Sequence, residues 1–68
     1  MEKVEIKSKG AMVEIKATMT AGKVHAILNA LEKHAEVSAT AYDARCMLRN
    51  ACQRDAANNP DSYLKDVQ

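Results

Sequence analysis

Met12-Val-Glu-Ile-Lys-Ala-Thr-Met19 alternates apolar and polar side chains along its whole length. Alternation of this kind is typical of a β-strand that buries one face, because successive side chains of a strand point to opposite sides. The apolar positions are Val13, Ile15, Ala17 and Met19, and the polar positions are Glu14, Lys16 and Thr18. The segment therefore predicts a strand with one apolar and one polar face.

A near-copy of this strand precedes it, because Lys3-Val-Glu-Ile-Lys7 matches the pattern Val-Glu-Ile-Lys of residues 13–16. Between the copies stands Gly10, which can adopt the positive φ that a tight turn needs. The two segments thus predict an antiparallel hairpin.

Charge selects between two registers of that hairpin. Pairing Ile6 with Val13 would set like charges opposite each other, whereas pairing Ile6 with Ile15 sets opposite charges together. The favourable pairs of the second register are Glu5 with Lys16 and Lys7 with Glu14. Each such pair contributes about 0.2–1 kcal/mol, so we expect the second register, with a four-residue loop over 9–12.

The same strand is also complementary to itself. Two antiparallel copies of Met12–Met19 centred on Ile15 would place Glu14 of each chain opposite Lys16 of the other. An intrachain hairpin and a ribbon made by two chains are therefore both consistent with the sequence.

Helical spacing replaces the alternation after Thr20, a suitable N-cap. We predict one helix over 21–34 and a second over 39–57, capped by Ser38 or Thr40 and ended by Asn58-Asn59-Pro60. The first apolar stripe is Val24, Ile27, Leu28, Leu31 and Ala35. The second is Ala41, Ala44, Leu48, Ala51 and Cys52.

The predicted fold class is thus α+β, a short strand or hairpin followed by two helices. Residues 1–57 form one small domain, and 58–68 form a C-terminal arm unless Tyr63 and Leu64 dock on the domain. A chain of 68 residues buries only about 60% of its unfolded surface, so we expect a homodimer to complete the core.

Composition argues against several classes of function. The net charge of +1 is no strong footprint for nucleic acid, and the absence of Trp and Phe argues against stacking of single-stranded bases. Cys46 and Cys52 are expected to be free cytosolic thiols, and His25 and His34 lie too far apart along a helix to share a metal. We expect no enzyme, cofactor, metal site or membrane span, and a cytoplasmic location.

Val37-Ser38-Ala39-Thr40-Ala41-Tyr42, preceded by Leu28-Asn-Ala-Leu31, resembles the corner between the two helices of ribbon-helix-helix transcription regulators. The resemblance covers about residues 12–50. It implies an intertwined homodimer whose two-stranded ribbon enters the major groove of double-stranded DNA. By position, the resemblance assigns Glu14, Lys16 and Thr18 to the bases, and the backbone amides of Ser38, Ala39 and Thr40 to a phosphate. A helix N-terminus favours an anion on general grounds as well.

Two functions remain open at this point. The first is a dimeric DNA-binding transcriptional regulator, favoured by the self-complementary strand and the helical corner. The alternative is a small protein-binding module, such as an inhibitor or adaptor of phage or mobile-element type, with its hairpin packed on the helical pair. Near-neutral charge favours the alternative, and we expect the first.

Overall fold

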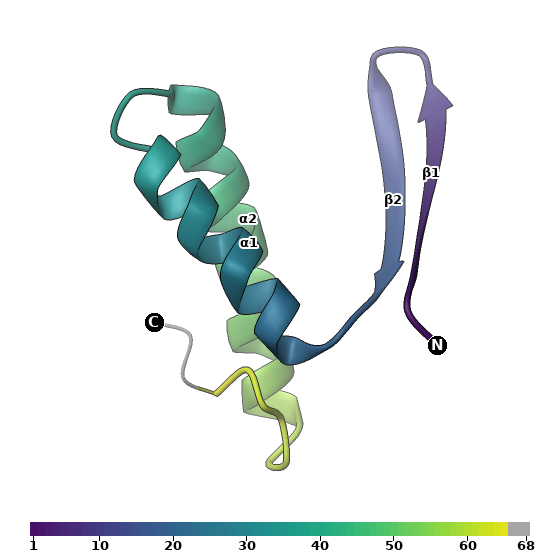
Figure 1. Cartoon of the computed structure of the whole chain (residues 1–68), viewed down its shortest axis with the longest axis vertical. Helices are drawn as coiled ribbons and strands as arrows, with labels where there is room; N and C mark the ends of the chain where they lie inside the picture. The colour runs from purple at the N-terminus through teal and green to yellow at the C-terminus, as the bar shows by residue number, and fades with distance from the viewer. Residues whose placement is uncertain (66–68) are drawn as a thin grey trace.

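The computed structural model describes residues 1–65 as a hairpin followed by two helices. The strands are β1 (Lys3–Lys9) and β2 (Met12–Thr18), and the helices are α1 (Ala21–His34) and α2 (Ala39–Asn58). The two helices lie side by side, and the hairpin stands apart from them (Figure 1). The α+β fold predicted from the sequence is confirmed.

The hairpin adopts the register that charge selects. Ile6 lies opposite Ile15, and the flanking pairs are Glu5 with Lys16 and Lys7 with Glu14. The loop is shorter than we predicted, because Lys9 and Met12 still pair and only Gly10 and Ala11 connect the strands. Gly10 has φ +65° and Ala11 has a negative φ, which fits a type II′ turn, whose twist matches that of the strands.

Both helices begin at the side chains predicted to cap them. The Lys23 backbone N–H donates to Thr20 Oγ1 at 3.3 Å, and the Ala41 N–H donates to Ser38 Oγ at 3.2 Å. Ser38, rather than Thr40, is therefore the cap of α2. At the other end, the Asn59 N–H donates to the Asp55 carbonyl at 2.8 Å, where the helix stops.

The core is small and lies between the helices. Leu28 and Cys52 are buried at its centre, with Val24, Leu48 and Leu64 packed around them. The predicted stripes are only partly buried, since Leu31 is intermediate and Ile27 remains 43% exposed. The reason is that α2 covers one side of α1, and no other element within residues 1–65 covers the side that carries Ile27.

The segment after α2 docks through one of the two residues we named. Leu64 packs on the core, whereas the Tyr63 side chain stays exposed. Ser62 is buried, donates to Asp55 Oδ2 and accepts from the Leu64 N–H at 3.0 Å. Residues up to Lys65 are consequently part of the helical unit rather than a free arm.

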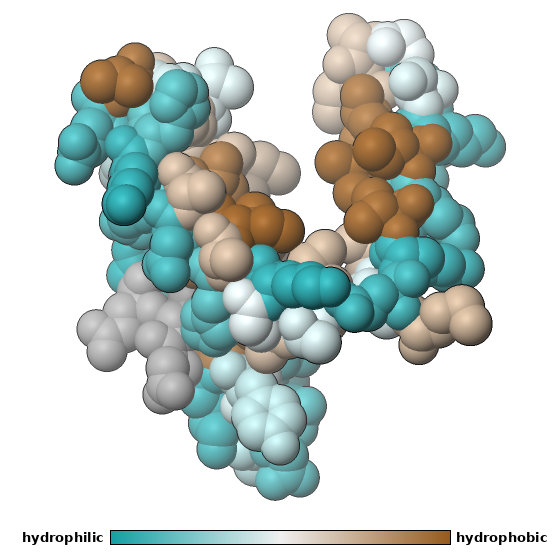
Figure 2. Space-filling model, viewed as in Figure 1, coloured by the Kyte–Doolittle hydropathy of each residue, from teal (hydrophilic) through white to brown (hydrophobic). Residues whose placement is uncertain are grey.

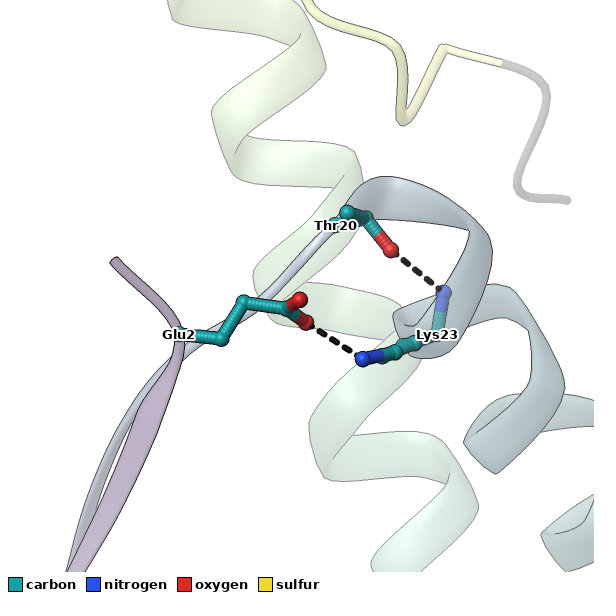
Figure 3. Close-up of polar contacts among 3 residues, drawn as sticks. All are labelled: Glu2, Thr20 and Lys23. Carbon is teal, nitrogen blue, oxygen red and sulfur yellow. Dashed lines mark hydrogen bonds and ion pairs between the residues drawn. The ribbon is translucent and has the colours of Figure 1, made fainter.

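The hairpin does not pack on the helices as the protein-binding alternative supposed. No Cα of either strand comes within 8 Å of a Cα in either helix. Apart from the chain itself, the polar link is an ion pair of 2.7 Å between Glu2 Oε1 and Lys23 Nζ, next to the Thr20 cap (Figure 3). The space between hairpin and helices therefore stays open. Neither described helix combines the length and apolar character needed to cross a membrane.

Candidate functional site

The hairpin register sorts its side chains onto two faces. Because paired residues of adjacent strands share a face, the polar residues of β2 join those of β1 on one side of the sheet. This side, the polar face, consists of Lys3, Glu5, Lys7, Lys9, Met12, Glu14, Lys16 and Thr18. All three residues assigned to the bases by resemblance, Glu14, Lys16 and Thr18, lie on it and are exposed.

Some of the charged side chains on the polar face form ion pairs with one another. Lys3 Nζ lies 2.8 Å from Glu5 Oε1, and Lys9 Nζ lies 3.3 Å from Glu14 Oε2. Within residues 1–65, Lys7 and Lys16 have no ion-pair partner within 4.0 Å. The partner of the Glu14 carboxylate is therefore Lys9, the residue beside it across the turn, rather than Lys16.

Sequence reasoning missed the contribution of β1 to this face. Lys3, Lys7 and Lys9 lie beside the β2 residues, so the face carries four lysines against two glutamates, a net charge of +2. The signal was present in the register, because pairing Glu5 with Lys16 places every odd-numbered residue of β1 on the polar side. The resemblance covers about residues 12–50 and therefore assigned no role to Lys3–Lys7.

The start of α2 is the second candidate site. Ser38 is half-buried and its hydroxyl is engaged by the Ala41 amide, whereas Ala39 and Thr40 are exposed. Within the described chain, the backbone N–H groups of Ala39 and Thr40 make no hydrogen bond. Free amides at a helix N-terminus attract an anion. The described chain does not bring this end of α2 next to the hairpin (Figure 1).

An apolar cleft separates the opposite side of the hairpin from the helices. Its volume is about 470 Å³, and its lining residues are Val4, Ile15, Ala17, Met19, Val24, Ile27 and Leu48. Figure 2 shows this as two hydrophobic areas, one on the hairpin and one on the helices, that face each other across open space. The hairpin residues Val4, Ile6, Val13 and Ile15 are each more than half exposed.

The remaining chemically notable side chains serve the helical pair. Arg45 lies 3.9 Å from Glu32 and 4.8 Å from the centroid of the Tyr42 ring, so it braces α2 against α1. Burial, with a smaller contribution from Asp55, raises the pKa of the Cys52 thiol, and both Cys46 and Cys52 are free thiols. Among residues 1–65, no three His, Cys, Asp or Glu side chains gather as a metal ion would require.

No protein-family model matches this chain, and neither the curated proteins nor the solved structures contain a match to it.

Proposed function

We propose that the protein is a small homodimeric transcriptional regulator that binds double-stranded DNA with the polar face of its hairpin. The observation that carries this proposal is the division of the hairpin into a polar face and an apolar one. The polar face is turned away from the helices, because Val4, Ile15 and Ala17 on the other side line the cleft.

The shape and charge of the hairpin support this role. The major groove is about 12 Å wide and admits a two-stranded antiparallel ribbon. Lys7 and Lys16 are not held in ion pairs within the described chain and are available to bases or phosphates. Thr18 adds a hydroxyl that can donate or accept and a methyl group that can pack on thymine. A dimer has two such polar faces, so their combined net charge is twice the +2 of a single face.

The α2 N-terminus would supply phosphate contacts. The amides of Ala39 and Thr40 are exposed, and the capping bond from Ala41 to Ser38 holds them in a fixed orientation. Contacts of this kind set the position of a protein on the duplex, while side chains in the groove read the sequence.

Selection from a pool of random duplexes, followed by fluorescence anisotropy at several salt concentrations, tests the proposal. Lys16→Ala and Thr18→Ala should each weaken binding to the selected duplex about tenfold or more, since one base contact contributes about 1–3 kcal/mol. Lys65→Ala, which changes an exposed lysine outside the hairpin, is the matched control and should bind as the parent does. The proposal is wrong if the parent protein retains no duplex even at about 50 mM salt.

Glu14→Gln separates charge repulsion from base reading. The substitution removes a negative charge from the polar face and releases Lys9, so non-specific binding should tighten, most strongly at low salt. Unchanged binding at low salt would indicate that β2 does not approach the phosphates.

The apolar cleft supports a second candidate function, a protein-binding module such as an inhibitor or adaptor. In that case a partner of a different sequence would fill the cleft and the polar face would be only a solvated surface. Ile27→Asp, at the 43% exposed cleft position, would abolish partner capture, whereas Lys16→Ala would leave it intact.

A further inference from the structure

The molecule exposes more surface than a compact chain of its mass. Its accessible area is 5559 Å² for 7.5 kDa, whereas folded monomers of this mass expose about 4,200 Å². Its radius of gyration is 12.9 Å, against about 11 Å for a compact chain of this length. The excess area of about 1,300 Å² exceeds the roughly 800 Å² per partner that a standard interface buries.

No segment of the described chain is available to cover the cleft. The residues after α2 are already held at another part of the helical pair, through Leu64 on the core and a 3.3 Å contact between His25 Nε2 and the Tyr63 carbonyl. The helices are packed on each other. Within residues 1–65 the apolar lining of the cleft is therefore left open to another molecule.

The strand edges indicate which molecule that is. In the two-stranded sheet each strand has one unpaired edge, and unpaired edges bind further strands. Antiparallel pairing of β2 with a second β2 about Ile15 sets Glu14 opposite Lys16 twice and Val13 opposite Ala17. The equivalent pairing of β1 about Ile6 would also set Glu5 opposite Lys7 twice, but it would place Lys3 opposite Lys9 and Val4 opposite Ser8. The β2 edge is thus complementary to itself, and the β1 edge is less so.

We propose that the occupant is a second copy of this chain, joined through β2 into a four-stranded antiparallel sheet of order β1-β2-β2-β1. Ile15 of each copy would lie at the two-fold axis. This inference rests on the dimer proposed above, specifies how it assembles, and requires no DNA.

This four-stranded arrangement gives a partner both to the open apolar cleft and to the unpaired edge of β2. In-register pairing about Ile15 keeps Val4, Ile6, Val13, Ile15 and Ala17 of both copies on one side of the sheet, and both helical pairs lie on that side. Each cleft is then closed by the partner's hairpin and helices. The two polar faces join on the opposite side, with eight lysines and four glutamates in all. The two central β2 strands, which carry Glu14, Lys16 and Thr18, then form the two-stranded ribbon that the major groove admits.

Charge complementation between two variants tests the β2 contact. Glu14→Lys alone would place lysines opposite each other across the axis, and Lys16→Glu alone would place glutamates there. Each variant should dimerise about tenfold or more weakly than the parent, because two attractive pairs become repulsive. An equimolar mixture should recover a 1:1 heterodimer, since both axial pairs are then complementary.

Mixing distinguishes this contact from damage to the hairpin itself. The same substitutions also alter the intrachain pairs of Glu14 with Lys7 and of Lys16 with Glu5, but mixing leaves those pairs unchanged. Recovery on mixing, measured by sedimentation equilibrium, therefore reports only on the contact between chains. Circular dichroism of each variant checks that the helices remain folded.

Cross-linking supplies a second measurement. In a Cys46→Ser background, Ile15→Cys should form a disulfide between copies under mild oxidation. The matched control is Ile6→Cys, which lies opposite Ile15 in β1. Three strand spacings would separate its two copies by about 14 Å, beyond the roughly 7 Å Cα limit of a disulfide. Only Ile15→Cys should therefore cross-link.

Three results would overturn the assembly. The parent could be a folded monomer at micromolar concentration, the mixed variants could fail to associate, or Ile6→Cys could cross-link as readily as Ile15→Cys. A dimer that passes these tests but binds no duplex would contradict the proposed DNA-binding function and leave the assembly intact.

Discussion

The hairpin and the helical pair are built from different kinds of interaction. All residues of both strands are exposed, so the hairpin is specified by its backbone pairing, its turn and its cross-strand charges. The helices have a core in which Leu28 is 6% and Cys52 3% exposed, so their arrangement depends on packing. An isolated two-stranded hairpin is at best marginally stable in water. A strand register can thus be well specified without burial, whereas a fixed position of one element against another depends on buried contacts.

Leu28→Ala should produce the largest change and test whether the helical pair carries the stability. Removing a buried leucine side chain should lower the free energy of unfolding by about 2–5 kcal/mol, measured by urea denaturation followed by circular dichroism. Leu31→Ala should cost less, since Leu31 is only half-buried in this structure. Equal losses at the two positions would mean that a partner completes the burial of Leu31.

Substituting the two glycines should give effects of opposite sign in the two regions. Gly10→Ala should destabilise the hairpin by about 1–2 kcal/mol, because φ +65° disfavours any residue with a Cβ. The surrounding space is open within 4 Å, so the cost is that of the backbone alone.

Gly22→Ala is the matched control in the first turn of α1. Its new Cβ would meet only Thr20 Oγ1, at 4.0 Å, and alanine is favoured over glycine in a helix by up to about 1 kcal/mol. Thermal unfolding should therefore show a lower midpoint for the first variant and a higher one for the second. A loss of stability in both would contradict the local origin of hairpin order.

Lys23→Gln should have the smallest effect on stability. It tests whether the ion pair with Glu2 holds the hairpin in position relative to the helices. The pair with Glu2 is exposed at both partners, and exposed ion pairs contribute about 0–1 kcal/mol. The free energy of unfolding should be nearly unchanged. The distribution of distances between spin labels at Ser8 and Gln53 should be broader in the variant than in the parent. Thr20→Ala, which removes the neighbouring α1 cap, should instead destabilise the helix by about 0.5–2 kcal/mol without that selective broadening.

The local structure was determined by the sequence itself. Alternation over Met12–Thr18, the opposite charges of Glu5 and Lys16, and a glycine at the turn were sufficient for the hairpin and its register, because each acts between neighbours in the sequence or directly across a turn. Thr20 and Ser38 likewise marked the helix starts, since a cap bonds amides three residues away. Placing Glu14, Lys16 and Thr18 on one exposed face followed from the same alternation.

Only the tertiary structure decided where these pieces lie relative to one another. Periodicity shows that Ile27 belongs to an apolar stripe, but not that α2 covers Leu28 and leaves Ile27 beside an open cleft. The docking of Leu64 and the separation of hairpin from helices depend on contacts between distant residues. Such contacts are selected by the packing of whole surfaces, and no local pattern in the sequence encodes which surfaces meet.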